Sequence, residues 1–246
     1  MTRLIPVISD LQVPLHDQRA VDAVATFLAD RNLQSVCVGD VLDSWQVSRW
    51  CRGLSGEYDG KLAEARDQAV KVMRSLRMSD LSRSNHDDRI ETYVSKYAPA
   101  LLSLPELRIE KFLRLDDINV AFHRNPMGLA PGWVMVHGDE GSLIASPGGT
   151  ALNIAKQFGT SIVCGHTHKM GLQHAHLSYG GIIRREVFGF EVGHLMQMGK
   201  AEYLKGGKAN WTQGFGVLVV DGNDVTPIPV PIREGRFYFD GKTWSG

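Results

Sequence analysis

Short apolar runs that end in acidic or imidazole residues are the feature that most constrains this chain of 246 residues. The runs at 4–8 and 35–38 have the composition of buried strands. The segment 17–30 between them repeats apolar residues with helical spacing, and Asp17 or a neighbour can cap its first turn. A strand, a helix and a second strand in this order form a βαβ unit, which sets the two strands parallel in one sheet. We therefore expect an α/β protein.

The rest of the chain contains further strands and helices without a clear break. Residues 44–83 hold two tryptophans, several glycines and one apolar helical stripe, and we interpret them as a helical insertion near the strand ends. Apolar runs predict strands at 118–122, 133–136 and 161–164, and helical spacing predicts helices at 90–97 and 150–158. Residues 210–246 alternate around Asp-Gly pairs, which predicts a region of β-hairpins. Because no repeat or linker separates these regions, we expect a single domain over 1–246.

The charge balance excludes several classes of partner. The chain has 27 Lys and Arg residues against 27 Asp and Glu residues, so its formal net charge is zero. A protein that binds long nucleic acid through phosphates, or lies on an anionic membrane, would carry a basic excess or a basic block. We therefore expect neither extended nucleic-acid binding nor a membrane partner. Three cysteines without a CxxC pair, the short N-terminal apolar stretch and the lack of an 18-residue apolar segment predict a cytoplasmic protein.

Five short clusters combine carboxylates, an amide and imidazoles. They are Asp10 with Gln12, Asp40 in the GDVLD of residues 39–43, Asn85 with His86, His137 before Gly138, and His166 with His168. Four of them directly follow a strand-like run, and ligands bind in α/β sheets beyond the carboxyl ends of parallel strands. These side chains suit two borderline divalent cations, which a carboxylate such as Asp40 can bridge. Such a pair activates a water and clamps an in-line displacement at phosphorus.

Each cluster taken singly also has an ordinary structural explanation. A lone His137 is more often a buried, hydrogen-bonded histidine, Asn85 a turn or cap residue, and Asp10 the N-cap of a following segment. His166 and His168 alternate along the chain, so an extended segment would point both imidazoles to the same side. It is the presence of all five clusters in one order that favours a metal site.

In this order the clusters resemble the motifs of the calcineurin-like metallophosphoesterase superfamily, and the chain looks most like its bacterial or phage members. The family pattern reads DxH, GDxxD, GNH[DE], GH and GHxH. The corresponding segments here are Asp10-Leu-Gln12, Gly39-Asp-Val-Leu-Asp43, Ser84-Asn-His-Asp87, His137-Gly138 and Gly165-His-Thr-His168. The resemblance spans residues 10–168, about two thirds of the chain. It implies two mixed β-sheets packed as a sandwich and flanked by helices, with the metals at the strand ends.

The resemblance also implies the cofactors and the roles of the site residues. Two divalent metal ions are expected, with Mn²⁺ as the first choice and Fe, Zn or Mg as alternatives. The ligands of one metal would be Asp10, Asp40 and His168, with Gln12 at the position of a further family ligand, and those of the other would be Asp40, Asn85, His137 and His166. Asp40 would bridge the two metals and His86 would be the catalytic acid that protonates the leaving alkoxide. An unperturbed histidine pKa near 6.5 suits that task.

Two positions depart from the family pattern. Gln12 stands where the family has a metal-binding histidine, and an amide oxygen is a neutral, weaker ligand than an imidazole, so the first site is expected to be weak, open or differently built. His16 in the same loop is a candidate substitute ligand, and an ordinary loop or core histidine is the alternative. Ser84 replaces a glycine, and the polar run 79–84 precedes Asn85 where a strand usually leads in.

Four further residues are candidates for substrate binding. Trp45 and Arg49 follow the GDVLD closely and would stack a base and hold a phosphate, while Arg83 and Arg89 flank His86 and would meet phosphate oxygens. The alternative is a core-facing helix whose arginines point to solvent.

We predict from these features a hydrolase, most specifically a metal-dependent phosphodiesterase. Its substrates would be small nucleotide or cyclic nucleotide diesters, attacked by a metal-bridging hydroxide. Two other functions stay open at this stage. One is a phosphomonoesterase or nuclease with the same site, and the other is a catalytically weakened relative that acts as a binding or scaffold module. Gln12 favours the last possibility, whereas the retained His86 speaks against it.

Overall fold

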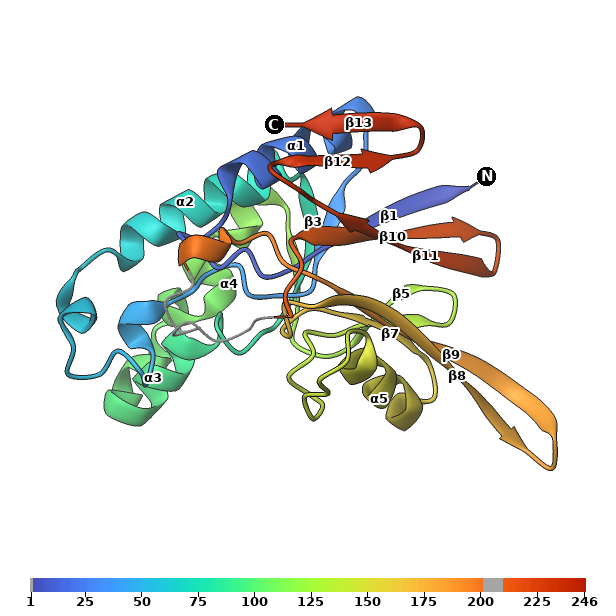
Figure 1. Cartoon of the computed structure of the whole chain (residues 1–246). Coiled ribbons are helices and arrows are strands. Elements are labelled where there is room, and N and C mark those ends of the chain that lie inside the picture. Colours follow the sequence, from blue (N-terminus) through green and yellow to red (C-terminus); the bar gives the residue numbers. More distant parts are fainter. Residues whose placement is uncertain (1, 201–209) are drawn as a thin grey trace.

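The computed structural model describes residues 2–200 and 210–246, which form two facing β-sheets with helices on both outer sides (Figure 1). The first sheet contains, in spatial order, β11 (Asp224–Pro231), β10 (Gly214–Asp221), β1 (Arg3–Ile8), β2 (Ser35–Cys37), β3 (Met78–Ser82) and β4 (Ala121–His123). The second contains β5 (Met127–Ala130), β6 (Trp133–Met135), β7 (Ser161–Cys164), β9 (Ile182–Val192) and β8 (Met170–Tyr179).

Both sheets are mixed. In the first, β1, β2, β3 and β4 run parallel to one another, while β10 pairs antiparallel with β1 and β11. In the second, β6, β7 and β9 are parallel, and β5 and β8 add antiparallel edges. The expected sandwich of two mixed sheets flanked by helices is therefore confirmed.

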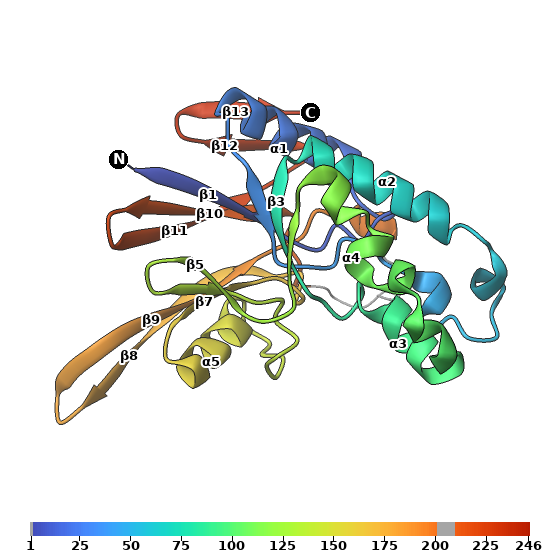
Figure 2. The ribbon, with the colours of Figure 1, turned by 180° about the vertical axis from the view of Figure 1, so that it is seen from behind.

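Helices cover the outer face of each sheet. They are α1 (Gln18–Asp30), α2 (Leu62–Ser75), α3 (Arg89–Tyr97), α4 (Ile109–Phe112) and α5 (Gly149–Phe158). The view from behind in Figure 2 shows α1 and α2 beside the first sheet and α5 beside the second, with α3 and α4 toward the end where the strands of the first sheet finish. Among the described residues, no helix has both the length and the apolar character needed to cross a bilayer.

The hydrophobic core lies in three layers because strand side chains alternate between the two faces of a sheet. Val7 on β1 and Leu218 on β10 pack between the sheets against Val163 and Phe190 of the second sheet. Ile8, one residue after Val7, instead joins the cluster under α1 and α2. A third cluster lies between the second sheet and α5. The sequence therefore places consecutive strand residues in different cores.

Helix α1 forms as its sequence predicts. Asp17 is its N-cap, and its side chain accepts a hydrogen bond from the backbone N–H of Arg19 at 3.1 Å. Its apolar stripe is fully buried, and Phe27 extends from it to the C-terminal hairpin of β12 (Arg236–Phe239) and β13 (Lys242–Ser245). The ring centroid of Phe27 lies 5.5 Å from that of Phe239 and 5.2 Å from that of Trp244, both edge to face.

The interpretation of 44–83 as a helical insertion is wrong for its last part. Two 3-10 turns, η1 (Trp45–Val47) and η2 (Ser55–Tyr58), and helix α2 fill the region up to Ser75, but Met78–Ser82 form β3, an interior strand of the first sheet. The polar composition of this strand concealed it. Its charge is satisfied locally, since Asp80 Oδ1 lies 2.8 Å from Nε2 of His123 on the neighbouring strand.

Hairpins form at the C-terminal end as expected, and β10 also joins the main sheet. A longer hairpin, β8–β9, was not predicted. Its strands of ten and eleven residues extend away from the body of the molecule (Figure 1).

Replacing Phe27 by Ala is expected to lower the free energy of unfolding by about 3–5 kcal/mol, because a buried ring is lost between α1 and the hairpin. Urea denaturation followed by circular dichroism measures this change. Thr26→Ala on the exposed face of the same helix is the control and should stay within about 0.5 kcal/mol of the wild type. A loss below about 1 kcal/mol for Phe27→Ala would contradict this account of the packing.

Candidate metal centre

The carboxyl ends of parallel strands from both sheets meet at one edge of the sandwich. The predicted ligands follow these strands: Asp10 after β1, Asp40 after β2, Asn85 and His86 after β3, His137 after β6, and His166 and His168 after β7. Hydrogen bonds join the two sheets there. The backbone N–H of His166 donates to Asp10 Oδ2 at 2.9 Å, and His137 Nδ1 lies 2.8 Å from the carbonyl oxygen of Val38.

The backbone at this edge adopts an unusual conformation. A positive φ is uncommon outside glycine, and such residues cluster at functional sites. Here the φ angles are 52° for Asp10, 44° for Gln12, 56° for Asp40, 65° for His166 and 57° for His168. The chain thus departs sharply from each strand at the residue that carries a candidate ligand.

The first group of candidate ligands consists of Asp10, Asp40 and His168, all buried. One ligand atom from each lies within 4.8 Å of the others. His168 Nε2 is 3.0 Å from Asp10 Oδ1. The amide nitrogen of Gln12 lies 3.1 Å from the same imidazole nitrogen and 3.4 Å from Asp40 Oδ2, so Gln12 enters this group through its NH₂ end.

The second group consists of Asp40, His137 and His166, again with ligand atoms within 4.8 Å of one another. His137 Nε2 lies 3.3 Å from Asp40 Oδ1 and 2.9 Å from Asn85 Oδ1. Because His137 Nδ1 faces the Val38 carbonyl, it carries a proton, and Nε2 is the atom left for a metal. Asp40 belongs to both groups, which is the arrangement that a bridging carboxylate requires.

The electrostatics of the two groups call for a cation. Burial alone would raise the pKa of Asp40, but His137 and His86 hold it well below its usual range. Burial likewise opposes ionisation of Asp10, and His168 lowers its pKa. In return, burial disfavours the charged form of His137, yet Asp40 raises its pKa to about 10. Two buried carboxylates with imidazole nitrogen atoms around them match divalent metal ions in charge and in donor type once the imidazoles release their protons to bind the metal.

The serine that replaces the family glycine has a clear structural role. Ser84 Oγ accepts the backbone N–H of Asp40 at 2.9 Å and donates to the Asp87 carboxylate at 2.7 Å. Asp87 also accepts the N–H groups of Val41 and Leu42 at 3.2 and 2.9 Å. The buried pair of Ser84 and Asp87 therefore fixes the loop that presents Asp40.

Gly165 is required by a close approach between the sheets. A Cβ atom at this position would lie 1.7 Å from Ser9 Oγ and 2.5 Å from Asp10 Oδ2. Any side chain at residue 165 would therefore push the GHTH loop away from Asp10.

The sequence did not predict the role of Glu191, which holds the GHTH loop in place through hydrogen bonds. Glu191 on β9 is fully buried, and its Oε2 accepts a hydrogen bond from Thr167 Oγ1 at 3.0 Å. Its Oε1 accepts the backbone N–H of Thr150 in the first turn of α5 at 3.0 Å. Thr167 lies between His166 and His168, so Glu191 orients both histidines through it. A Glu within the apolar second half of β9, after Val-Phe-Gly-Phe, was the available signal.

His86 lies beside the second group, with its ring held at both nitrogens. Its Nδ1 is 3.2 Å from Asp43 Oδ1, and Arg89 Nη2 donates to its Nε2 at 2.8 Å. Nε2 is also 3.9 Å from Asp40 Oδ2. Burial lowers the pKa of His86, but Asp40 and Asp43 outweigh this and raise it above its ordinary value.

Carboxylates engage the two arginines that were expected to meet phosphate. Arg83 donates to Asp88 through Nη2 and to Asp139 through Nη1, both at 2.8 Å. Arg89 donates to Asp43 as well as to His86. Neither guanidinium points freely into the site.

The other two candidates for substrate binding lie in and after η1. Trp45 is half-buried in this turn, while Arg49 is exposed and stacks over Trp50 with its Cζ 4.7 Å from the ring centroid. The substrate-binding roles of all four residues stay predictions.

Two other buried histidines, His16 and His194, lie outside both ligand groups. His16 is buried, and its Nε2 lies 3.1 Å from Gln18 Oε1; it is not a member of either ligand group found among the described residues. His194 follows β9, is fully buried, and its ring centroid lies 5.7 Å from that of His168. Its Nδ1 accepts the backbone N–H of Met196, so the neutral ring carries its proton on Nε2.

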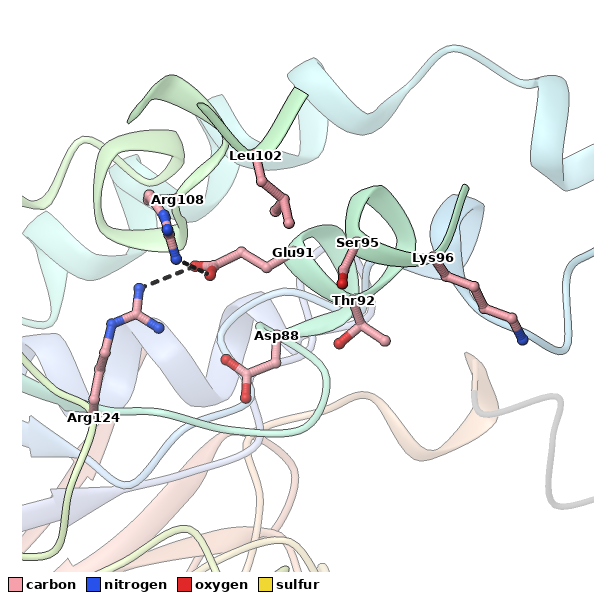
Figure 3. Close-up of a pocket in the computed structure, with 8 residues that line it drawn as sticks. All are labelled: Asp88, Glu91, Thr92, Ser95, Lys96, Leu102, Arg108 and Arg124. Atoms are coloured by element: carbon pink, nitrogen blue, oxygen red, sulfur yellow. Dashed lines mark hydrogen bonds and ion pairs between the residues drawn. The ribbon is translucent and has the colours of Figure 1, made fainter. Parts of the chain in front are cut away.

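A surface pocket of about 520 Å³ lies next to α3 rather than at the ligand groups (Figure 3). Its arginines are paired, since Arg108 and Arg124 both contact Glu91, at 3.1 and 3.0 Å. Asp88 on its rim is also the partner of Arg83. The pocket holds none of the candidate ligands.

Comparison with known proteins identifies relatives over the full length. The chain is 38% identical over 255 aligned residues to the Gene 54 protein of Mycobacterium phage D29, with all of both chains covered. It is 35% identical, again over 255 residues and all of both chains, to the Gene 54 protein of Mycobacterium phage L5. The chain belongs to the Gene 54 protein family. That membership by itself assigns no activity.

Other comparisons add little to this relationship. No protein-family model matches the chain. A crystal structure of wild-type Vps29 from Entamoeba histolytica, complexed with Zn²⁺, aligns with 99% of this chain and 97% of its own, at 15% sequence identity and a TM-score of 0.43. Similarity this low bears on neither the activity nor the ligands of the present chain.

Replacing Glu191 by Ala leaves two buried donors, Thr150 N–H and Thr167 O–H, without their acceptor. We expect the free energy of unfolding to fall by about 1–3 kcal/mol and the affinity for Mn²⁺ or Zn²⁺ to fall about 10–100-fold. Denaturation and metal titration measure the two effects. Glu191→Gln keeps the shape and one acceptor, so its losses should be smaller. If Glu191→Ala bound metal as tightly as the wild type, Glu191 would not orient the histidines.

Proposed function

We propose that this chain is a metal-dependent phosphoesterase of the metallophosphoesterase type, and specifically a phosphodiesterase for small nucleotide or cyclic nucleotide diesters. The observation that carries the proposal is the position of Asp40, whose carboxylate belongs to two adjacent groups of metal ligands. His86, a group able to transfer a proton, lies beside it with Nε2 at 3.9 Å. Mn²⁺ is the first choice of metal, and Fe, Zn or Mg also suit these ligands.

Each residue of the site has a distinct part in the proposed reaction. Metal ions, when bound, would supply an activated water and would stabilise the charge that develops on phosphorus. Asp10 and Asp40 contribute the anionic ligands, and His137 presents Nε2 because Nδ1 is committed to Val38. Asp43 lies beside Nδ1 of His86 and orients its ring, and His86 gives the proton on Nε2 to the leaving oxygen.

In this proposal Arg89 contacts His86 when no substrate is bound and a phosphate oxygen when substrate is bound. Its Nη2 donates to His86 Nε2, the atom that must carry the catalytic proton, so the guanidinium has to leave this position when a substrate binds. A phosphate oxygen is the natural partner for the released guanidinium. Trp45, half-buried in η1, is proposed as the surface on which a base stacks.

A specific observation favours a second candidate, a binding or scaffold module with weakened catalysis. The amide nitrogen of Gln12 contacts two ligands of the first group, at the position where the metallophosphoesterase motif has a metal-binding imidazole. The two candidates predict opposite outcomes in a hydrolysis assay.

Metal-stripped protein is expected to hydrolyse bis(p-nitrophenyl) phosphate only after Mn²⁺, Mg²⁺ or Zn²⁺ is added back, and to prefer this diester over p-nitrophenyl phosphate. The release of nitrophenolate measures both rates. Asp40→Ala removes the shared ligand and should abolish the activity, whereas His174→Ala on the exposed hairpin should not change it. A failure of every metal to support cleavage of either ester would favour the binding module. Preference for the monoester would indicate a phosphatase.

Substitution of His86 by Ala should lower turnover of a diester with a poor alkoxide leaving group about 10²–10⁴-fold, because that leaving group needs a proton. Nitrophenyl diesters, which leave without one, should lose far less. Steady-state kinetics on both kinds of substrate provide the comparison. Equal losses would show that His86 contributes through binding or structure and not as an acid.

A further inference from the structure

The two ligand groups differ in what occupies the space between the ligands. In the second group, Asp40 Oδ1 and Asn85 Oδ1 face His137 Nε2 at 3.3 and 2.9 Å. These are a carboxylate oxygen, an amide oxygen and the imidazole nitrogen left for a metal, so a cation placed among them meets three ligand atoms.

The first group contains a hydrogen-bond donor, the side-chain amide of Gln12. Gln12 Nε2 lies 3.1 Å from His168 Nε2 and 3.4 Å from Asp40 Oδ2. An amide NH₂ has two N–H donors and no lone pair available for a metal. It therefore donates to Asp40 Oδ2 and lies against His168 Nε2, so that it occupies space between two ligands that a cation at this position would require.

The backbone keeps Gln12 in place. The residue is fully buried with a φ of 44°, its N–H donates to the Asp40 carbonyl at 2.8 Å, and its own carbonyl accepts the N–H of Leu15 at 2.7 Å. To act as a ligand, the amide must turn so that its oxygen points to the site. That orientation would set an oxygen acceptor against Asp40 Oδ2 unless a cation lay between them.

We infer that the two metal sites are unequal: the chain binds one divalent cation tightly, at Asp40, Asn85, His137 and His166, while the Gln12 amide fills the first site. A second cation has to displace or turn that amide, and it binds about tenfold or more weakly because the hydrogen bond to the Asp40 carboxylate and the contact with His168 are lost. The inference rests on the proposed metal-binding function, and it identifies Gln12 as the residue that sets the metal stoichiometry.

Equilibrium dialysis of metal-stripped protein against Mn²⁺, with metal analysis of the retained protein, tests this inference. An exposed group of His174, His176 and Glu186 on the β8–β9 hairpin has ligand atoms within 4.8 Å of one another and is a potential source of extra binding. The titration is therefore run both in the wild type and in a His174→Ala/His176→Ala background. The EPR spectrum of bound Mn²⁺ is the second readout, since it distinguishes isolated ions from a spin-coupled pair.

We expect one tight Mn²⁺ per chain, with the spectrum of isolated ions, in the background variant. Gln12→His should bind two tightly and give the coupled spectrum. Gln12→Ala, which removes the amide without adding a ligand, should bring the second dissociation constant closer to the first. It serves as the alternative variant if Gln12→His does not fold, as judged by circular dichroism.

The possible failures are distinguishable. Two equally tight ions in the background variant would overturn the inference and leave the proposed function intact. One tight ion in all three proteins, with no change in the second constant, would show that Gln12 does not control the first site. The lack of any tight ion would count against the proposed metal-dependent function itself.

Discussion

The buried carboxylate of Asp40 is the constraint around which this edge of the molecule is organised. It is almost completely shielded from water, and a buried charge is tolerated only when it is paired and hydrogen-bonded. Its partners come from both sheets, with His137 from the second sheet and the backbone N–H of His86 from the loop after β3. The loop that carries it is fixed in turn by Ser84 and Asp87. The convergence of strand ends therefore provides the space for this charge and also the groups that stabilise it.

Two contacts restrain the groups on which the proposed function depends. Gln12 places an amide donor among the ligands of the first group, and Arg89 donates to the nitrogen that His86 would use as an acid. Each contact places a donor against an atom that the proposed function would use. A substrate phosphate and a metal ion are the kinds of ligand that could replace them, because each offers stronger charge complementarity than an amide or a neutral imidazole.

The sequence predicted which of these residues come together because they follow apolar runs and appear in a characteristic order. Asp10, Asp40, His137, His166 and His168 meet at the expected edge. Prediction failed where a local pattern was weak. Strand β3 is polar and was assigned to an insertion, because His123, the residue that contacts its Asp80, lies 43 residues further along the chain on a neighbouring strand. Glu191 passed unnoticed for the same reason, as its partners on α5 and in the GHTH loop are distant in sequence.

The sequence by itself determined the class of fold, the strand ends at which polar residues gather, and the identity of most candidate ligands. These depend on hydrophobic periodicity and on residue type, which are local properties. Only the tertiary structure decided how the polar groups are paired. Arg83 lies between Asp88 and Asp139 instead of facing a phosphate, and Gln12 presents its nitrogen to the site. Such pairings are set by side chains from different loops that come within hydrogen-bonding distance only after the two sheets have packed together.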